Sequence, residues 1–230
     1  MIVFFRDDDV DEVNPQLTNL VKMFAEEKVP INLEVVPGRV GISTTPINNL
    51  KNFFNKYKDF IEVHQHGFNH FEYAPRNEFP DERINLVVSE EIKAGKIFLE
   101  TYFKEFFYPA FTPPWHRIGK FHIPVIEKLG FKIISAGFNL NHKLKDLSVY
   151  TDLSIFDNKL KKSRFATKEE LIEKFEKLKK EKSSEMIGFY LHHKFYKTPE
   201  SIEPIREFIK YLKEKEVKIK TFSQIWELHK

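Results

Sequence analysis

Three adjacent aspartates, Asp7, Asp8 and Asp9, follow a short apolar run at the start of the chain. Neighbouring carboxylates repel one another, so such a cluster is costly unless a cation or hydrogen-bond donors stabilise it. An exposed turn, with one aspartate capping the following helix, accounts for the same residues equally well. By themselves, the aspartates leave a cation site and an ordinary turn equally open.

Two histidines, His66 and His70, are four residues apart, with Gly67 between them. On a helical turn this spacing directs both imidazoles to one face, where they can bind a metal through nitrogens at about 2.0–2.1 Å. An isolated pair of histidines is more often a feature of the surface or the core. Combined with an aspartate from another strand end, however, the pair forms an Asp-His-His set that leaves positions open for water and substrate. His64, two residues before His66, is predicted to share its side of the extended chain and to support it.

Two further segments carry polar or aromatic side chains at predicted strand ends. Residues 108–117 end in a proline-rich loop, which is either a rigid turn or a pocket wall. We predict a pocket wall whose substrate-binding residues are Pro114, Trp115, His116 and Arg117.

Residues 188–193 form an apolar run that ends in a pair of histidines. A histidine there, with a pKa near neutrality, is placed to donate a proton to a leaving group. We predict that His192 is this acid, with His193 as the alternative, because a register slip of one residue exchanges the two.

Short apolar runs alternate with amphipathic stretches along the whole chain, and this alternation predicts parallel strands joined by helices. The predicted strands are residues 2–5, 31–36, 60–64, 107–111, 131–135, 149–155, 186–192 and 217–221. Helices are predicted around residues 17–24, over residues 81–106, after a capping box at Thr167 and Glu170, and from a start between Pro199 and Pro204. We expect a single α/β barrel domain over residues 1–230, with its site at the carboxyl ends of the strands.

Composition excludes several classes of protein and of site. The chain has 230 residues, of which 41% are hydrophobic and 31% charged, as expected of a soluble globular protein. Its lysine-rich runs are mixed with glutamate, which indicates solvated helix faces, and we expect neither a nucleic-acid nor a membrane partner. The absence of cysteine excludes disulfides, thiolate metal ligands and a cysteine nucleophile. No signal peptide or long apolar run is present, so a cytoplasmic location is expected.

These residues resemble the motifs of the polysaccharide deacetylases, carbohydrate esterase family 4, in a compact and divergent form. The family's Asp-Asp pair matches Asp8-Asp9, and its His-x-x-x-His motif matches His66 and His70. Its third motif, which resembles Arg-x-Pro-Tyr, aligns with residues 112–115, and its final Leu-His matches Leu191-His192. The resemblance implies a distorted (β/α)7 barrel. It also implies that Asp9, His66 and His70 bind a divalent metal ion.

The chain departs from the family pattern at two motifs. Thr112 occupies the position of the arginine that usually orients the catalytic aspartate, and Arg6 and Arg117 are the candidates to replace it. The fourth motif, an Asp and Trp pair, is represented at best by Asp157, which is followed by Asn158. Substrate recognition is therefore less well defined than the metal site.

The resemblance implies an N-deacetylase acting on a small acetylated amino sugar or a related acylated amide. Zinc is expected to polarise the acyl oxygen and to lower the pKa of a water molecule toward about 7. Asp8 would take the proton of that water, backbone N–H groups near residues 112–117 would stabilise the oxyanion, and His192 would protonate the departing amine. Asp7 is assigned a structural role.

Two other functions remain open. The chain could be a weakly catalytic or non-catalytic carbohydrate-binding module that retains the metal, or a hydrolase of some other small amide. The loops expected to decide the substrate are residues 38–47, 74–80 and 139–146. The oligomeric state is not predicted.

Overall fold

The computed structural model describes residues 1–71, 82–136, 145–146, 149–152, 154–157, 162–181 and 186–228. Within these ranges, the side chains of residues 82–85, 120, 145–146, 149–152, 154–157 and 162–164 are not described.

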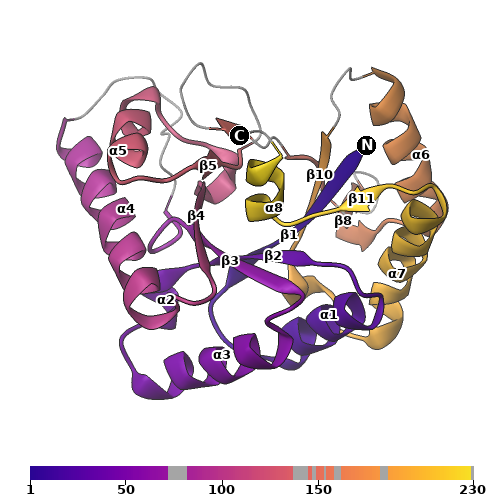
Figure 1. Cartoon of the computed structure of the whole chain (residues 1–230), viewed down its shortest axis with the longest axis horizontal. Helices are drawn as coiled ribbons and strands as arrows, with labels where there is room; N and C mark the ends of the chain where they lie inside the picture. Colours follow the sequence, from indigo (N-terminus) through magenta and orange to yellow (C-terminus); the bar gives the residue numbers. More distant parts are fainter. Residues whose placement is uncertain are drawn as a thin grey trace.

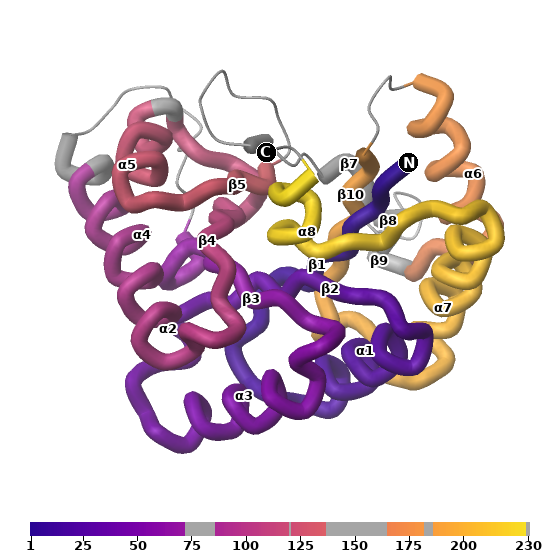
Figure 2. Tube along the Cα trace, viewed as in Figure 1, coloured from indigo at the N-terminus to yellow at the C-terminus, as the bar shows by residue number. Residues whose placement is uncertain are grey.

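A curled parallel sheet forms the centre of the molecule (Figure 1). In the described part of the chain its nine strands are β1 (Ile2–Val10), β2 (Ile31–Val35), β3 (Ile61–His66), β4 (Phe107–Thr112), β5 (Ile133–Ile134), β6 (Lys145–Asp146), β7 (Val149–Asp152), β10 (Met186–Leu191) and β11 (Lys218–Ile219). Their order is β6-β5-β4-β3-β2-β1-β10-β7, and β11 pairs with β1 beside this path. The chain's last segment thereby returns to its first strand (Figure 2). The predicted distorted (β/α) barrel is confirmed.

Helices surround the outer face of the sheet, and α8 lies near its centre (Figure 1). They are α1 (Pro15–Glu26), α2 (Pro37–Val40), α3 (Thr44–Tyr57), α4 (Glu82–Tyr102), α5 (Ile123–Lys128), α6 (Lys168–Glu181), α7 (Pro199–Glu214) and α8 (Phe222–Glu227). The capping box predicted for α6 is confirmed: the Thr167 N–H donates to the Glu170 carboxylate (2.8 Å), and the Glu170 N–H donates to the Thr167 hydroxyl (3.3 Å). In the described residues, no helix has the length and apolar character needed to cross a membrane.

The observed elements differ from the sequence predictions in several places. Residues 44–57 form helix α3, which was not predicted, because its polar asparagines and lysines obscure the buried stripe of Ile47, Leu50 and Phe54. The predicted strand 149–155 is two strands, β7 and β8 (Ser154–Asp157), and β8 pairs antiparallel with β9 (Lys162–Phe165). The predicted strand 217–221 shrinks to the two residues of β11. Residues 74–80 and 139–144, expected to shape the substrate site, lie outside the described residues.

Alternation along the central strands separates two faces of the sheet. On the outer face, Phe5 of β1 and Phe189 of β10 are fully buried and stack at 5.7 Å in the large core formed with the helices. On the inner face, Phe4 of β1 packs edge-on against Phe222 of α8 at 5.1 Å. Burying a phenylalanine contributes about 1.5–3 kcal/mol, so the helices and α8 hold the sheet from both sides. The inner face therefore carries the residues that a site inside the barrel can use.

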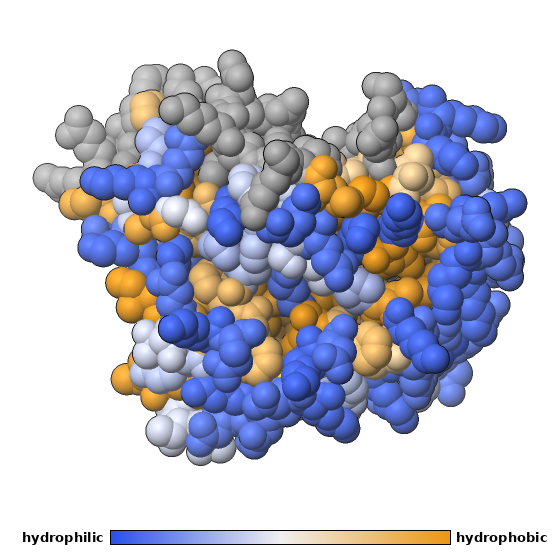
Figure 3. Space-filling view, viewed as in Figure 1, coloured by the Kyte–Doolittle hydropathy of each residue, from blue (hydrophilic) through white to orange (hydrophobic). Residues whose placement is uncertain are grey.

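Hydrophilic side chains cover the outer surface of α6 and α7 (Figure 3). Lys177, Lys179 and Lys180 of α6 are exposed, and Lys177 lies 3.8 Å from Glu181. The interpretation of this lysine run as a solvated helix face is confirmed. The other run, residues 159–162, lies largely outside the described residues.

A buried cluster of three ionisable side chains, His64, Glu34 and Glu62, lies inside the barrel beneath the strand ends. The Nδ1 of His64 is 2.9 Å from Glu34 Oε1, and its Nε2 is 2.8 Å from Glu62 Oε1. The ring of His64 stacks on Phe222 at 4.4 Å, and the Ser223 N–H donates to Glu62 at 2.9 Å. His64 thus bridges two strands and secures α8, instead of supporting His66 directly.

Because His64 lies between two carboxylates, we predict that the fold loses stability at alkaline pH. Burial alone would lower the pKa of His64, but the carboxylates of Glu34 and Glu62 raise it to about 9. Because the pKa of His64 is raised in the folded state, its protonation stabilises the fold fully at pH values below the ordinary pKa near 6.5. This stabilisation is lost as pH rises through about 9. The expected loss is about 3 kcal/mol. Urea unfolding at about pH 6 and about pH 9.5, with a chelator present, measures it. In His64→Gln this part of the pH dependence should vanish, and an unchanged pH dependence would contradict the prediction.

Candidate metal centre and catalytic residues

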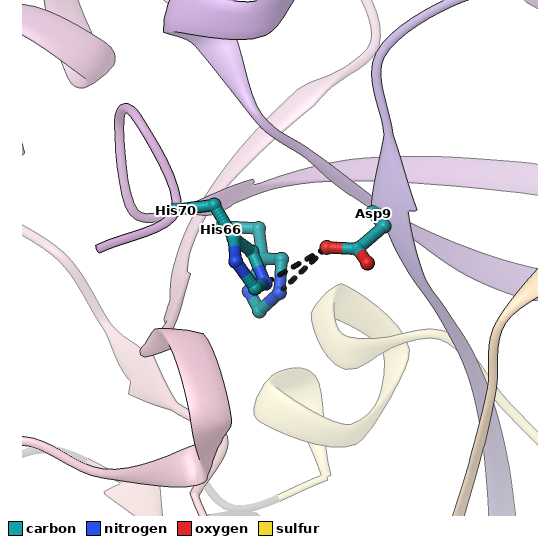
Figure 4. Close-up of side chains that lie close together, drawn as sticks. All are labelled: Asp9, His66 and His70. Atoms are coloured by element: carbon teal, nitrogen blue, oxygen red, sulfur yellow. Dashed lines mark ion pairs between the residues drawn. The ribbon is translucent and has the colours of Figure 1, made fainter. Parts of the chain in front are cut away.

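Three potential ligand atoms converge where β1 and β3 end (Figure 4). The Oδ1 of Asp9 is 2.8 Å from His70 Nε2 and 3.6 Å from His66 Nε2. The three ligand atoms all lie within 4.8 Å of one another. The structure thus brings together the three residues predicted from the sequence, although they come from two strand ends that are far apart along the chain.

A bulge in β1 turns Asp9 into the site. Regular alternation would send Asp8 and Asp9 to opposite faces of the sheet. Asp9 instead has a left-handed backbone, with φ 66°, and the register between β1 and β2 shifts between Asp7 and Val10. A bulge of this kind re-aims a side chain beside a site. As a result, Asp8 and Asp9 both face the site. The aspartates lie in strand β1, so the exposed turn that the sequence also allowed is not formed.

The segment that carries His70 is a loop, so the predicted helical turn is wrong. Gly67 and His70 have φ values of 61° and 63°, and these values reverse the chain after β3. The side-chain amide of Gln65 donates to the Gly67 carbonyl at 3.0 Å, and that of Asn69 donates to Glu91 on α4 at 2.9 Å. The two imidazoles still meet, with ring centroids 4.9 Å apart.

Helix α2 fixes the same loop from the other side. The Gly38 N–H donates to the Phe68 carbonyl at 2.9 Å. A Cβ on Gly38 would lie 2.2 Å from Asn69 Oδ1, so no larger residue allows this close approach. Arg39 of α2 places its guanidinium 3.8 Å from Asp9 Oδ1.

The protonation states of these residues suit a divalent cation. The Nδ1 of His66 is 3.0 Å from the Thr112 carbonyl, which can only accept, so the lone pair of the neutral ring is on Nε2, facing Asp9. Burial lowers the pKa of His66 and keeps it neutral. Burial would raise the pKa of Asp9, but its contact with His70 at 2.8 Å and the nearby imidazole of His66 hold it below the ordinary value. Two imidazole nitrogens and one carboxylate oxygen fit zinc or a similar ion.

Arg6 holds Asp8, and this settles which arginine replaces the one missing at Thr112. Its Nε and Nη2 donate to the two oxygens of Asp8 at 2.7 Å and 2.9 Å, from two residues away on β1. Both side chains are buried. Burial would raise the pKa of Asp8, but the positive charge of Arg6 lowers it and keeps the carboxylate ionised. Arg117, the other candidate, is exposed on the loop after η1 (Pro114–His116).

His192 and His193 are separated by the alternation that continues past the end of β10. His193 is fully buried on the outer face, where its N–H and its ring Nδ1 bond the two oxygens of Asp7 at 2.7 Å and 2.8 Å. His192 is partly exposed, and its ring lies 6.0 Å from that of Tyr190, which packs against the inner-face cluster. Asp7 therefore anchors His193, as its predicted structural role requires, and leaves His192 on the inner face.

The predicted pocket wall carries two consecutive strained residues. Trp115 and His116 have φ values of 58° and 57°, which are uncommon for residues other than glycine. Trp115 is 64% exposed, and its ring is 5.6 Å from that of His70. His116 contacts Arg6, whereas Pro114 is buried inside the turn. Of the four residues predicted to bind the substrate, Trp115 and Arg117 are therefore exposed, His116 is partly buried and Pro114 is buried.

Comparison with known proteins finds similarity in structure alone. No protein-family profile and no curated protein matches the sequence. The carbohydrate esterase family 4 domain of a multidomain xylanase from the hindgut metagenome of Trinervitermes trinervoides matches 99% of this chain and 90% of that chain, with a TM-score of 0.65 and 10% identity. A family 4 acetyl xylan esterase from Clostridium thermocellum, in complex with a cobalt ion, matches 99% and 91%, with a TM-score of 0.61 and 15% identity. A pseudoenzyme of this family from Bacillus anthracis matches 98% and 65%, with a TM-score of 0.61 and 12% identity.

The chain has the carbohydrate esterase family 4 fold. At identities of 10–15% the likeness concerns the fold, and the chemistry depends on the residues that this chain places in it.

Within this carbohydrate esterase family 4 fold, sequence reasoning missed several residues around the site. Tyr190 contacts the rings of His116 and His192, at 4.4 Å and 6.0 Å. Its position two residues before His192 in a strand was a usable signal, because alternation puts both on one face. Phe195 is 50% exposed beside His192. Phe195 reaches His192 through the local turn η3 (His193–Phe195), where its N–H donates to the His192 carbonyl at 3.1 Å, whereas tertiary packing alone brings Arg39 of α2 to the site.

Proposed function

We propose that the chain is a metal-dependent hydrolase that removes an acetyl group from an amino sugar or a related amide. The observation that carries the proposal is the convergence of Asp9, His66 and His70 beside the buried pair of Asp8 and Arg6. The fold supports the same class, because its structural neighbours include esterases of carbohydrate esterase family 4.

The proposed cofactor is one divalent ion, with zinc as the expected metal. Asp9, His66 and His70 would hold it, and the cobalt ion reported for the Clostridium thermocellum esterase supports an ion of this kind. When bound, such an ion would supply Lewis-acid polarisation of the acyl oxygen and a lowered pKa for a water molecule.

The chain's own residues would move the protons. Asp8, ionised and oriented by Arg6, would accept a proton from the attacking water as the new C–O bond forms. His192 would donate a proton to the amine nitrogen as the C–N bond breaks, so that acetate and a free amine leave. Arg6 acts through Asp8 and is a positioning residue.

Exposed aromatic rings support a sugar-like substrate. Trp115 lies against His70, and Phe195 lies against His192, so an exposed ring adjoins each of two site histidines. Aromatic faces offer apolar contact area to the C–H groups of a sugar ring. We propose that Trp115, together with His116 and Arg117 of the same loop, binds the substrate.

The direct test is acetate release by the purified protein loaded with Zn²⁺ or Co²⁺. The substrates are N-acetylated amino sugars, acetylated sugar esters and small acetylated amides. We expect release that a chelator abolishes and added metal restores. Preference for the sugars supports the proposed substrate class, whereas preference for small amides favours the alternative amide hydrolase. The absence of metal-dependent release from the whole panel would contradict the proposal.

A second candidate function is carbohydrate binding without turnover. The Bacillus anthracis pseudoenzyme favours this function, because it is similar in fold to this chain and is not an active enzyme. A mutant of that protein has restored enzymatic activity. Thr112 at the usual arginine position points the same way, although Arg6 makes the contact to Asp8 instead. Sugar binding that persists in Asp8→Asn, without any acetate release by the wild type, would favour this function.

A further inference from the structure

Arg6 uses every N–H of its guanidinium. Besides its two bonds to Asp8, its Nη1 donates to the carbonyl and the hydroxyl of Ser135, at 3.0 Å and 2.8 Å. Its Nη2 also lies 2.7 Å from His116 Nδ1. An arginine has five N–H groups, no acceptor, and a charge that it keeps at all working pH values. His116 Nδ1 must therefore accept this hydrogen bond, and the ring proton of the neutral imidazole must be on Nε2.

His116 stays neutral in this position. Burial and the positive charge of Arg6 lower the pKa of His116 to about 3, although the carboxylate of Asp8 opposes them. The charge of Arg6 and the acceptor role of Nδ1 thus select one form of the ring, with a lone pair on Nδ1 and a hydrogen on Nε2. No hydrogen bond of Nε2 is found within the described residues, and the side chain is only partly buried.

The surroundings place this imidazole among the reacting groups. Its ring lies 4.4 Å from that of Tyr190, which also contacts His192. Arg6, which contacts His116, also bonds both oxygens of Asp8. Backbone strain is characteristic of functional sites, and both His116 and the preceding Trp115 have a left-handed backbone.

The loop itself offers fewer donors than the sequence led us to expect. The His116 N–H donates to the Pro113 carbonyl at 3.0 Å, and the Arg117 N–H donates to the Pro114 carbonyl at 3.2 Å. These two backbone groups are thus engaged within the turn. Within the described residues the Trp115 N–H makes no backbone hydrogen bond and remains available, and a side-chain donor on this loop would add to it in stabilising an oxyanion.

We propose that the Nε2–H of His116 donates a hydrogen bond to the acyl oxygen of the substrate and strengthens it as that oxygen gains charge. The inference rests on the proposed deacylation and adds a catalytic residue to it. No proton is transferred, because the neutral ring acts only as a polarising donor. Such a donor favours the transition state over the ground state, so its loss lowers kcat more than it raises KM.

Two substitutions separate this role from a structural one. His116→Asn keeps an acceptor near the Nδ1 position for Arg6 but has no donor at the Nε2 position. His116→Gln reaches the Nε2 position with an N–H and gives up the Nδ1 geometry. We expect His116→Asn to lower kcat about 100-fold with KM changed less than about threefold, and His116→Gln to lose about 10-fold or less. Equal losses, or a larger loss in His116→Gln, would overturn the proposal. Thermal unfolding of both variants verifies that they are folded.

Two readouts do not depend on turnover. Nitrogen-15 NMR of histidine-labelled wild-type protein should find Nδ1 of His116 unprotonated and Nε2 protonated at neutral pH. Acetate, the released product, should bind the zinc-loaded His116→Asn protein about 10-fold more weakly than the His116→Gln protein. A protonated Nδ1, or equal acetate affinities, would overturn the role of His116. A wild type without activity on any acyl substrate would instead contradict the proposed function, and these two measurements would still decide the tautomer and the donor.

Discussion

His66→Leu is expected to abolish tight binding of Zn²⁺ or Co²⁺ by the purified protein. His66 is fully buried, and the Thr112 carbonyl orients it so that its free nitrogen faces Asp9. Loss of a partner that merely orients a ligand costs about 10–100-fold in metal affinity, so loss of the ligand itself should cost at least about 100-fold. Leucine has a similar volume and leaves no large cavity. Isothermal titration calorimetry and metal analysis after dialysis measure the affinity and the bound metal.

His122→Leu is the matched control for this prediction. His122 is also buried, in the short helical turn η2 (Lys120–His122), and its Nδ1 makes no hydrogen bond in the described part of the chain. The control should bind one ion with wild-type affinity. Metal should also raise the thermal unfolding temperature of the wild type and of His122→Leu, because an ion that binds the folded state stabilises it, but not that of His66→Leu. Wild-type affinity in His66→Leu would refute the proposed ligand set.

Asp8→Asn is expected to lower kcat by about 10²–10⁴-fold while the metal stays bound. The substitution keeps the size of the side chain and removes the charge that accepts the proton. Asp8 is not among the three converging ligand atoms, so metal affinity should change by less than about 10-fold. One hydrogen bond from Arg6 to the new amide is lost, which should reduce the free energy of unfolding by about 1–3 kcal/mol. Acetate release at saturating metal, calorimetric titration and urea unfolding separate the three effects.

Asp11→Asn makes the same chemical change nearby and outside the site. Asp11 pairs with Lys194 at 2.7 Å near the surface, so its substitution should leave kcat within about twofold of the wild type. If Asp8→Asn retained wild-type turnover, Asp8 would not be the base. The proton would then have to be accepted elsewhere in the site.

Residue types and local spacing were enough to predict the fold class and the histidine pair of the candidate metal site, whereas the choice of Asp9 came from the resemblance to the family motif. The alternation of apolar runs with amphipathic stretches requires parallel strands and crossover helices, whatever the details of packing. His66 ends β3 and His70 comes four residues later, so a short segment brings them together. The capping box of α6 involves residues three positions apart, and this local geometry also follows directly from the sequence.

The choice among equivalent residues was decided by tertiary structure. Both Arg6 and Arg117 were candidates to hold Asp8, and the geometry of one strand selects Arg6. His193 was an alternative to His192 until its bonds to Asp7 placed it on the outer face. Strand alternation determines relative faces, but it does not say which face lies inside the barrel.

Asp9 is the clearest example of what long-range structure decides. Its side chain reaches the histidines because a bulge interrupts the alternation of β1, and the bulge arises from the register between β1 and β2. Asp9 and His66 are far apart in the sequence, so their approach within 3.6 Å depends on the packing of three neighbouring strands. The sequence by itself determined which chemical groups are available and which strand ends carry them. Only the tertiary structure decided which groups meet, because strand register and backbone conformation at single residues set the final distances.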